Sequence, residues 1–339
     1  MIRKNFAGRL RHDDRGTVTA DIAVDFEAAT GPFRHELVVH CYRMTGSVHE
    51  AEDLTQETLL RAWKARERYD RDRASLRTWL YRIATNVCLT ALEGRARRPL
   101  PSGMGRPSAD PDAPLTPDLE VPWLQPLPDR FLPQEQTDPA FRATQRAGVR
   151  LALVAAMQLL PARQRAVLVL RDVLSFSAAE VAVQLDTSTA AVNSALQRAR
   201  ATVAAAAPEV SAVREPEDRA VRQTIERYMQ AFEAADVAAL VALLTDDAVL
   251  EMPPVPLWYA GRVDYGRFMA RIFAMRGGWR MHRTAVNGQP ALAAYCPDDS
   301  GTLFLHTLQV FTVSRSGIER NVVFGDPDVL KSFGLASSL

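Results

Sequence analysis

Lysine, cysteine and long apolar runs are scarce in this 339-residue chain. Only three of its 41 basic residues are lysine, which is typical of a GC-rich bacterial genome. The three cysteines exclude a disulfide framework and are too far apart for a metal motif, so we expect reduced thiols at Cys41, Cys88 and Cys296. No segment is apolar enough to span a membrane, and residues 1–15 lack the apolar core of a signal peptide. The sequence therefore predicts a soluble, cytoplasmic protein without a metal site.

The net charge of +1 would argue against a nucleic-acid partner if the charge were evenly spread. However, residues 1–98 carry +4 and residues 146–207 carry +4, whereas residues 99–145 carry −4 and residues 208–339 carry −3. Two parts of the chain are therefore candidates for DNA binding. With 47% hydrophobic and 24% charged residues, the chain is globular and long enough for two or three domains.

A helix-turn-helix pattern occupies residues 167–203. Ser177 and Glu180 form a capping box that starts the first helix, and a turn is expected at residues 186–188. In the second helix an apolar stripe is predicted from Val192, Leu196, Ala199 and Val203. The residues on its other side are polar or basic and are candidates for base contacts: Thr189, Asn193, Ser194, Gln197, Arg198 and Arg200. An amphipathic hairpin with a merely solvated face is the alternative.

Two further helices are predicted near the N-terminus. In residues 50–63 an apolar face leaves Glu52, Asp53 and Glu57 outside, and a merely solvated surface is the alternative. The next helix has an expected core stripe of Leu76, Leu80, Ile83, Val87 and Ala91. A second face of that helix carries Thr78, Arg82, Thr85, Asn86 and Leu89. An amide such as that of Asn86 offers both a donor and an acceptor to an unpaired base.

Residues 99–145 are rich in proline and acids and are predicted to be a linker rather than a long helix. Within them, residues 121–132 are too apolar for a fully solvated tether. We therefore expect this part of the linker to dock on a folded domain, with contacts from Trp123, Leu127 and Phe131.

The last 126 residues predict an α+β domain. Helices are expected at residues 217–235, 237–244 and 262–274, and strands at residues 279–286, 291–295, 303–313 and 317–324. Asn287 and Gly288 mark a hairpin turn. Candidate pocket residues, for which simple core packing is the commoner role, are Met252, Trp258, Tyr259, Phe268, Phe273, Trp279 and His282. The ionisable residues Asp246, Asp247, Glu251, His282 and His306 are scattered and form no recognisable catalytic group.

Residues 50–63 and 69–98 resemble region 2 of the extracytoplasmic-function (ECF) sigma factors of the sigma-70 family, and residues 153–203 resemble region 4. The resemblance implies that a stretch of helix docks on the clamp of the largest subunit of core RNA polymerase, through Asp53, Leu54, Thr55, Gln56 and Glu57. It also implies that Asn86 captures a base flipped from the minus-10 element, while Arg71, Arg73, Arg77 and Arg82 follow phosphates and Trp79 or Tyr81 stacks on a base. Core packing is the alternative for both aromatic residues. The polar face of the second helix of the helix-turn-helix would contact the minus-35 element.

The C-terminal part resembles the SnoaL-like branch of the nuclear-transport-factor-2-like cone fold, which occurs fused to a subgroup of ECF factors. The expected organisation is a tail over residues 1–24, region 2 over 25–98, the linker over 99–145, region 4 over 146–207 and the SnoaL-like domain over 208–339. The predicted fold class is thus multidomain, with two all-α domains followed by an α+β cone domain built on a curved antiparallel sheet.

The resemblance predicts a sigma factor without enzymatic activity or cofactor, regulated by its C-terminal domain, with a small apolar ligand as a candidate effector. Two other classes share some of these features: a helix-turn-helix repressor with a ligand-sensing domain, and a SnoaL-like enzyme fused to a DNA-binding module. One departure concerns the minus-35 helix, where many ECF factors have basic residues and this chain has Asn193 and Ala195. We therefore expect an unusual minus-35 sequence and a weaker phosphate contribution to affinity.

Overall fold

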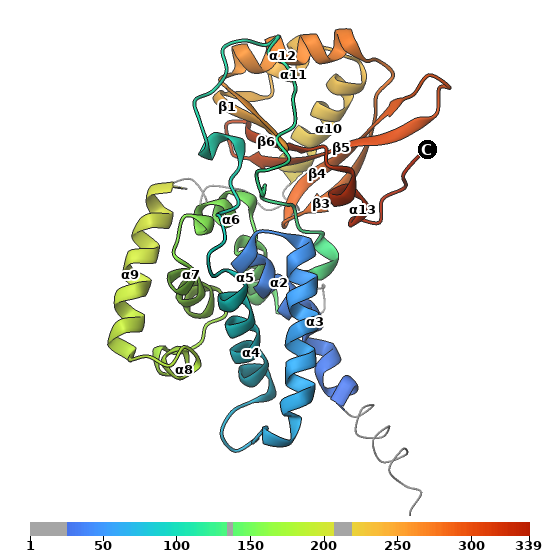
Figure 1. Cartoon of the computed structure of the whole chain (residues 1–339). Helices are drawn as coiled ribbons and strands as arrows, with labels where there is room; N and C mark the ends of the chain where they lie inside the picture. Colours follow the sequence, from blue (N-terminus) through green and yellow to red (C-terminus); the bar gives the residue numbers. More distant parts are fainter. Residues whose placement is uncertain (1–25, 134–137, 207–218) are drawn as a thin grey trace, which may run out of the picture.

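The computed structural model describes residues 26–133, 138–206 and 219–339, which form a helical half and a sheet-containing half (Figure 1). The N-terminal part has three main helices, α2 (Arg34–Thr45), α3 (Val48–Ala65) and α4 (Leu76–Ala91). Ser47 and Ser75 cap α3 and α4, because each hydroxyl accepts a hydrogen bond from a backbone N–H three residues further on. Apolar residues of all three helices share one core, among them Leu37, Cys41, Ala51, Leu80 and Cys88.

The second helical part follows the linker. It consists of α5 (Pro139–Ala147), α6 (Leu151–Gln158), α7 (Ala162–Leu168) with a π-helical turn at Val169–Val173, α8 (Ala178–Gln184) and α9 (Thr189–Ala206). The predicted capping box at the start of α8 is confirmed, with Ser177 and Glu180 bonding each other's backbone N–H. Of the predicted stripe, Val192, Leu196 and Ala199 are buried and Val203 is half-buried, so α8 and α9 form the predicted helix-turn-helix.

The C-terminal part confirms the α+β class. Its helices are α10 (Arg219–Glu233), α11 (Val237–Val241), α12 (Arg262–Met275) and α13 (Pro327–Lys331). Its strands are β1 (Leu244–Met252), β2 (Val255–Ala260), β3 (Arg280–Val286), β4 (Gln289–Pro297), β5 (Leu303–Val313) and β6 (Ile318–Phe324). The sheet order is β2-β1-β6-β5-β4-β3.

Two features of the sheet differ from the sequence prediction. Strands β1 and β2 lie between α11 and α12 and are missing from the strand ranges predicted above. The pairing of β1 with β6 is parallel, so the sheet is mixed and not purely antiparallel. The other pairings are antiparallel, and the predicted turn at Asn287 and Gly288 joins β3 to β4, with φ angles of 56° and 66°.

Both faces of this sheet carry buried apolar residues. Helices α10, α11 and α12 cover one face, where their apolar residues pack on Leu250, Leu292 and Phe311. The opposite face belongs to the same apolar cluster as the helical half, through Ala291, Leu308, Val310, Val322 and Phe324. The helical half therefore serves as the second cover of the sheet, and separating the two halves would expose apolar surface.

The linker connects the three parts. Residues 105–118 run along β2 and α12, where the backbone N–H of Ser108 donates to the carbonyl of Trp258 over 2.8 Å. Residues 121–132 then pass between the sheet and the helices (Figure 1). None of the helices in the described parts of the chain combines the length and apolarity needed to cross a bilayer.

Candidate polymerase and nucleic-acid interfaces

The predicted polymerase-binding stretch lies on α3. Asp53 and Gln56 are exposed, and Leu54 and Glu57 are half-buried. The Glu57 carboxylate pairs with Arg61 one turn further on, with a distance of 2.6 Å between Oε1 and Nε. Thr55 requires a correction: it is only 1% exposed, and its hydroxyl donates to the carbonyl of Ala51. Its position on the core side of α3 leaves its side chain unable to contact a partner in this structure.

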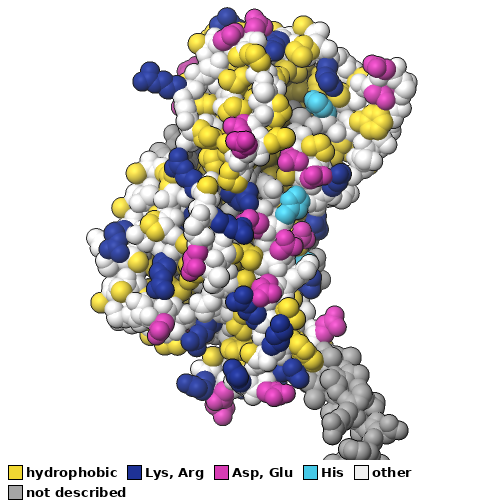
Figure 2. All heavy atoms as spheres, viewed as in Figure 1, with side chains coloured by type: hydrophobic (Ala, Val, Ile, Leu, Met, Phe, Trp, Pro, Cys, Tyr) yellow, Lys and Arg dark blue, Asp and Glu magenta, His cyan; other side chains and the backbone are white. Residues whose placement is uncertain are grey.

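The predicted minus-10 residues lie on α4 and on the loop before it. Asn86 and Arg82 are exposed on α4, and Arg71 and Arg73 are exposed in the loop. Trp79 is half-buried, and its ring packs on Tyr69 with a centroid distance of 5.0 Å. Figure 2 shows basic side chains gathered at the lower end of the helical half, where α3 passes to α4, interspersed with acidic ones.

The buried stripe of α4 is wider than predicted. Tyr81 is 1% exposed and donates to the Glu36 carboxylate, so core packing and not base stacking describes it. Thr85 is also buried and forms a hydrogen bond with His40. Burial, reinforced by nearby Arg43, lowers the pKa of His40 to about 3, which keeps this imidazole neutral. The face that carries Asn86 is therefore narrower than the sequence pattern indicated.

Arg77 differs from its predicted role as a free phosphate contact. Its guanidinium pairs with Glu36 over 3.1 Å and lies over the ring of Tyr81. It also lies 5.4 Å from the ring of Phe176, which belongs to the second helical part. Phe176 and Tyr81 pack edge to face at 5.6 Å. The two predicted DNA-binding domains are thus in direct contact.

The predicted minus-35 face of α9 is fully exposed, because all six candidate residues lie on the solvent side of the helix. Two of them have internal partners. The Arg198 guanidinium donates to Ser194, and Arg200 forms a bidentate ion pair with Asp172 at 2.7 and 2.8 Å. The exposed row has no acid of its own, yet Asp172 from the preceding π-helical turn neutralises one of its two arginines.

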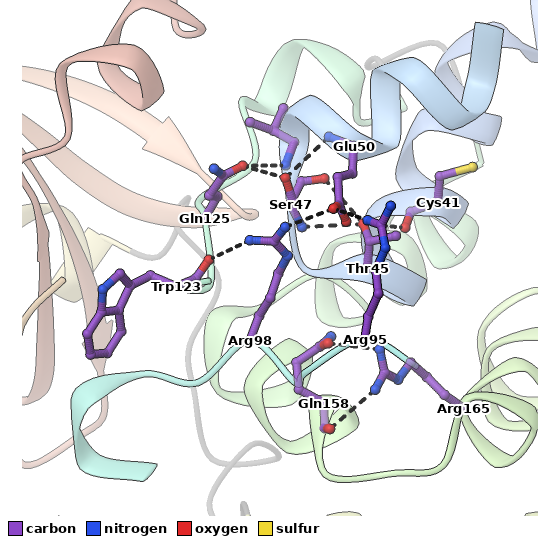
Figure 3. A network of polar contacts seen from close by, with 11 residues as sticks. Cys41, Thr45, Ser47, Glu50, Arg95, Arg98, Trp123, Gln125, Gln158 and Arg165 are labelled. Carbon is purple, nitrogen blue, oxygen red and sulfur yellow. Dashed lines mark hydrogen bonds and ion pairs between the residues drawn. The ribbon is translucent and has the colours of Figure 1, made fainter. Parts of the chain in front are cut away.

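The apolar part of the linker is docked at the centre of the molecule. Trp123, Leu127 and Phe131 are all less than 9% exposed. Figure 3 shows how neighbouring polar groups fix this segment on α3: the Gln125 side chain accepts from the Ser47 hydroxyl over 2.7 Å and from the backbone N–H of Val48. Gly46 ends α2 with a φ of 72°, and an added Cβ there would lie 2.8 Å from Leu124.

The tip of the β3–β4 hairpin joins all three domains, a role that the sequence did not indicate. Asn287 is completely buried. Its side-chain oxygen accepts from the linker N–H of Leu127 over 2.7 Å, and its amide donates to the Tyr42 hydroxyl of α2 and to the Val149 carbonyl before α6. The sequence signal at this position, Asn before Gly, indicated only a turn.

Two buried arginines join the helical domains. Arg43 of α2 is fully buried and donates to the carbonyls of Gly148 and Gln145. Arg165 of α7 donates to the carbonyl of Met44 and to the side chain of Gln158. Burial lowers the pKa of each guanidinium to about 10, so both remain charged at neutral pH. Removing either partner would leave a buried charge or buried carbonyls unsatisfied.

The cone domain contains a pocket with a volume of about 250 Å³. Of the predicted lining residues, Met252, Phe268 and Trp279 line it, whereas Trp258, Tyr259, Phe273 and His282 do not. His306 does line it, although the sequence had placed it in no group. No carboxylate is among the described residues of its wall.

Comparisons with known proteins agree with this architecture. Family models match Sigma-70 region 2 over residues 32–98, Sigma-70 region 4 over residues 150–203 and the SnoaL-like domain over residues 225–318. The ECF RNA polymerase sigma factor SigG of Mycobacterium tuberculosis H37Rv is 48% identical over 319 residues, covering 93% of this chain and 85% of SigG. SigJ of the same organism is 30% identical over 66% of this chain and 62% of SigJ.

A solved structure shows the same fold. The crystal structure of M. tuberculosis SigJ aligns with a TM-score of 0.60 and 24% identity, covering 91% of this chain and 98% of that structure. The fold and the family matches together define the class of this protein: a sigma factor with two helical domains joined to a SnoaL-like domain. The chain belongs to the family of ECF RNA polymerase sigma factors.

Proposed function

We propose that three exposed surfaces of this sigma factor share the work of transcription initiation. The α3 surface around Asp53, Gln56 and Glu57 binds the clamp of core polymerase. The α4 face with Asn86 captures a flipped base of the minus-10 element, and the polar face of α9 binds the minus-35 element. The observation that carries this proposal is that Asn86 and the α9 residues are exposed on helices whose other faces are buried.

The SnoaL-like domain regulates these surfaces by holding the helical domains together. By their positions, the minus-10 and minus-35 elements lie about 25 base pairs apart, or about 85 Å at a rise of about 3.4 Å per base pair. The contact between Tyr81 and Phe176 places the two DNA-binding domains side by side instead. They must separate to bind both elements, and the buried contacts of Asn287 oppose that separation.

This assignment excludes the two other classes. The matches to both Sigma-70 regions and to SigG support this: a repressor needs no Sigma-70 region 2, and a fused enzyme needs neither Sigma-70 region. ECF sigma factors start transcription without chemistry of their own. Promoter-dependent transcripts from core polymerase plus this protein test the assignment directly, because neither alternative class would produce them.

We expect the double variant Asp53→Lys, Glu57→Lys to lose affinity for core polymerase. Reversing these two charges places like charges against a surface that is complementary to acids, which lowers the association rate and the affinity. Binding of labelled core measures the effect, and we expect at least tenfold weakening. The matched control is Asp298→Lys, Asp299→Lys, two exposed acids in a turn of the C-terminal domain. Equal core affinity of the parent and the α3 variant would show that α3 is not the binding face.

We expect Arg198→Ala to weaken minus-35 binding. If the guanidinium contacts a phosphate, the slope of log affinity against log salt should fall by about 1; if it contacts guanine, specificity should relax at one base pair and cost about 1–3 kcal/mol. Arg163→Ala in α7, outside the α9 face, is the control. Titrations of promoter fragments at several salt concentrations separate these results. Unchanged affinity and unchanged selected sequences would mean that the α9 face is only solvated.

A further inference from the structure

The pocket of the cone domain is open to the outside and mostly apolar. It lies between α10, α12 and the inner face of the sheet. Aromatic and aliphatic side chains make most of its wall, from Phe232, Phe268, Met269, Ile272 and Trp279. A cavity of roughly 150 Å³ holds benzene, so a pocket of about 250 Å³ suits a molecule of about ten non-hydrogen atoms, the size of two fused rings.

One side of the pocket is polar but uncharged. Gln309 and Asn321 line it and are bonded to each other and to the hydroxyl of Tyr228. The side-chain oxygen of Asn321 is buried, and no described residue donates a hydrogen bond to it. His306 also lines the pocket at its exposed edge, where partial desolvation and the nearby Arg276 lower its pKa below the usual value, which favours the neutral imidazole at pH 7. No Asp, Glu, Lys or Arg is among the described lining residues.

The linker between the two DNA-binding domains forms part of the pocket mouth. Leu115 and Pro117 line it, and Leu115 packs on the core of the cone domain. Backbone contacts hold this segment in place. Arg271 of α12 donates to the carbonyls of Pro111 and Ala113 over 2.8 Å, and the N–H of Asp118 donates to the carbonyl of Pro254 over 2.9 Å.

We propose that this pocket binds a neutral, mostly apolar small molecule with one hydroxyl group, which donates to the side-chain oxygen of Asn321. Because Leu115 and Pro117 complete the wall, a bound molecule touches the linker only while residues 105–118 are docked. Such a ligand binds the docked arrangement more tightly and so disfavours the separated one. The effect of the ligand on the domain arrangement, the coupling step, rests on the proposed regulatory role of the SnoaL-like domain. Binding of the ligand to the pocket, the binding step, does not.

The binding step is tested with 2-naphthol and full-length protein by calorimetry. Naphthalene, which has the same rings without the hydroxyl, should bind at least fivefold more weakly, since the Asn321 oxygen then stays unpaired. Val323→Phe puts extra atoms into the pocket and should reduce 2-naphthol binding at least tenfold without unfolding the protein, as judged by its melting temperature. Equal binding of 2-naphthol by parent and Val323→Phe would overturn the site.

The coupling step is tested at the linker. Leu115→Ser should weaken 2-naphthol binding several-fold, whereas Leu119→Ser, at an exposed linker position outside this pocket, should not. In the parent, 2-naphthol should slow hydrogen exchange at the N–H groups of Ser108 and Asp118 and lower core affinity several-fold. Binding that leaves both exchange and core affinity unchanged would overturn the coupling. Absence of promoter-dependent transcripts without any ligand would instead count against the proposed function.

Discussion

Asn86→Ala should leave core polymerase binding intact and severely reduce open-complex formation. The amide lies on the exposed face of α4, so its removal breaks no core contact and should change the melting temperature little. A bidentate contact to a base is worth about 1–3 kcal/mol, which corresponds to a loss of roughly fivefold to over a hundredfold. Permanganate reactivity of promoter thymines measures the melted state, and pull-down of core measures polymerase binding.

A second asparagine supplies the control for this prediction. Asn193→Ala removes the same amide from the exposed face of α9 and should weaken minus-35 binding while leaving melting of an already bound promoter unchanged. Asn86→Asp, which keeps the size but loses the amide donor, should resemble Asn86→Ala. Parent-like permanganate reactivity in Asn86→Ala would remove this residue from the minus-10 site.

Local signals in the sequence predicted the helices well. The capping box of Ser177 and Glu180 and the spacing of Val192, Leu196 and Ala199 depend on neighbours within one or two turns, so they can be recognised without knowing the fold. The same holds for the turn at Asn287 and Gly288, which needs positive φ angles at both residues.

Contacts between residues far apart in the sequence escaped prediction because they depend on long-range packing. Tyr81 and Thr85 of α4 looked available for DNA, but Glu36 and His40 of α2 bond their hydroxyl groups. The parallel partner of β1 lies about seventy residues away in β6, as Glu251 opposite Val322 illustrates, so no local pattern marks it. Burial of the linker was expected from its apolar residues, yet its path along β2 and α12 was not.

For the candidate sites too, the sequence predicted local features and missed contacts with distant residues. Exposed positions such as Asn86 and Arg198 follow from helix periodicity plus family resemblance. Arg77 and Arg200 have acidic partners, Glu36 and Asp172, that lie outside the helix carrying each arginine. Their availability for DNA therefore depends on rearrangements that only the folded structure reveals. An arginine that is already paired must exchange its carboxylate partner for DNA, which lowers its net contribution to the free energy of DNA binding.

Asn287→Gly should raise the affinity of the full-length protein for core polymerase. Glycine accepts the φ of 56° at this position, so the hairpin turn survives while the amide that joins three domains is lost. The N–H of Leu127 then loses its acceptor inside the closed arrangement. An unsatisfied buried group costs about 1–3 kcal/mol, and only the closed arrangement bears this cost. The equilibrium should shift toward separated domains by about fivefold to 150-fold.

The gain in core affinity has an upper limit set by the closed population. If polymerase binds only the arrangement with separated domains, the apparent affinity rises with the fraction of molecules in that arrangement. The affinity stops rising when this fraction reaches one. X-ray scattering should show a larger radius of gyration for Asn287→Gly than for the parent. Asp299→Gly, in an exposed turn of the same domain, should match the parent in both measurements. If Asn287→Gly has the parent's radius of gyration and the parent's affinity for core polymerase, the hairpin tip supports the fold without restraining the DNA-binding domains.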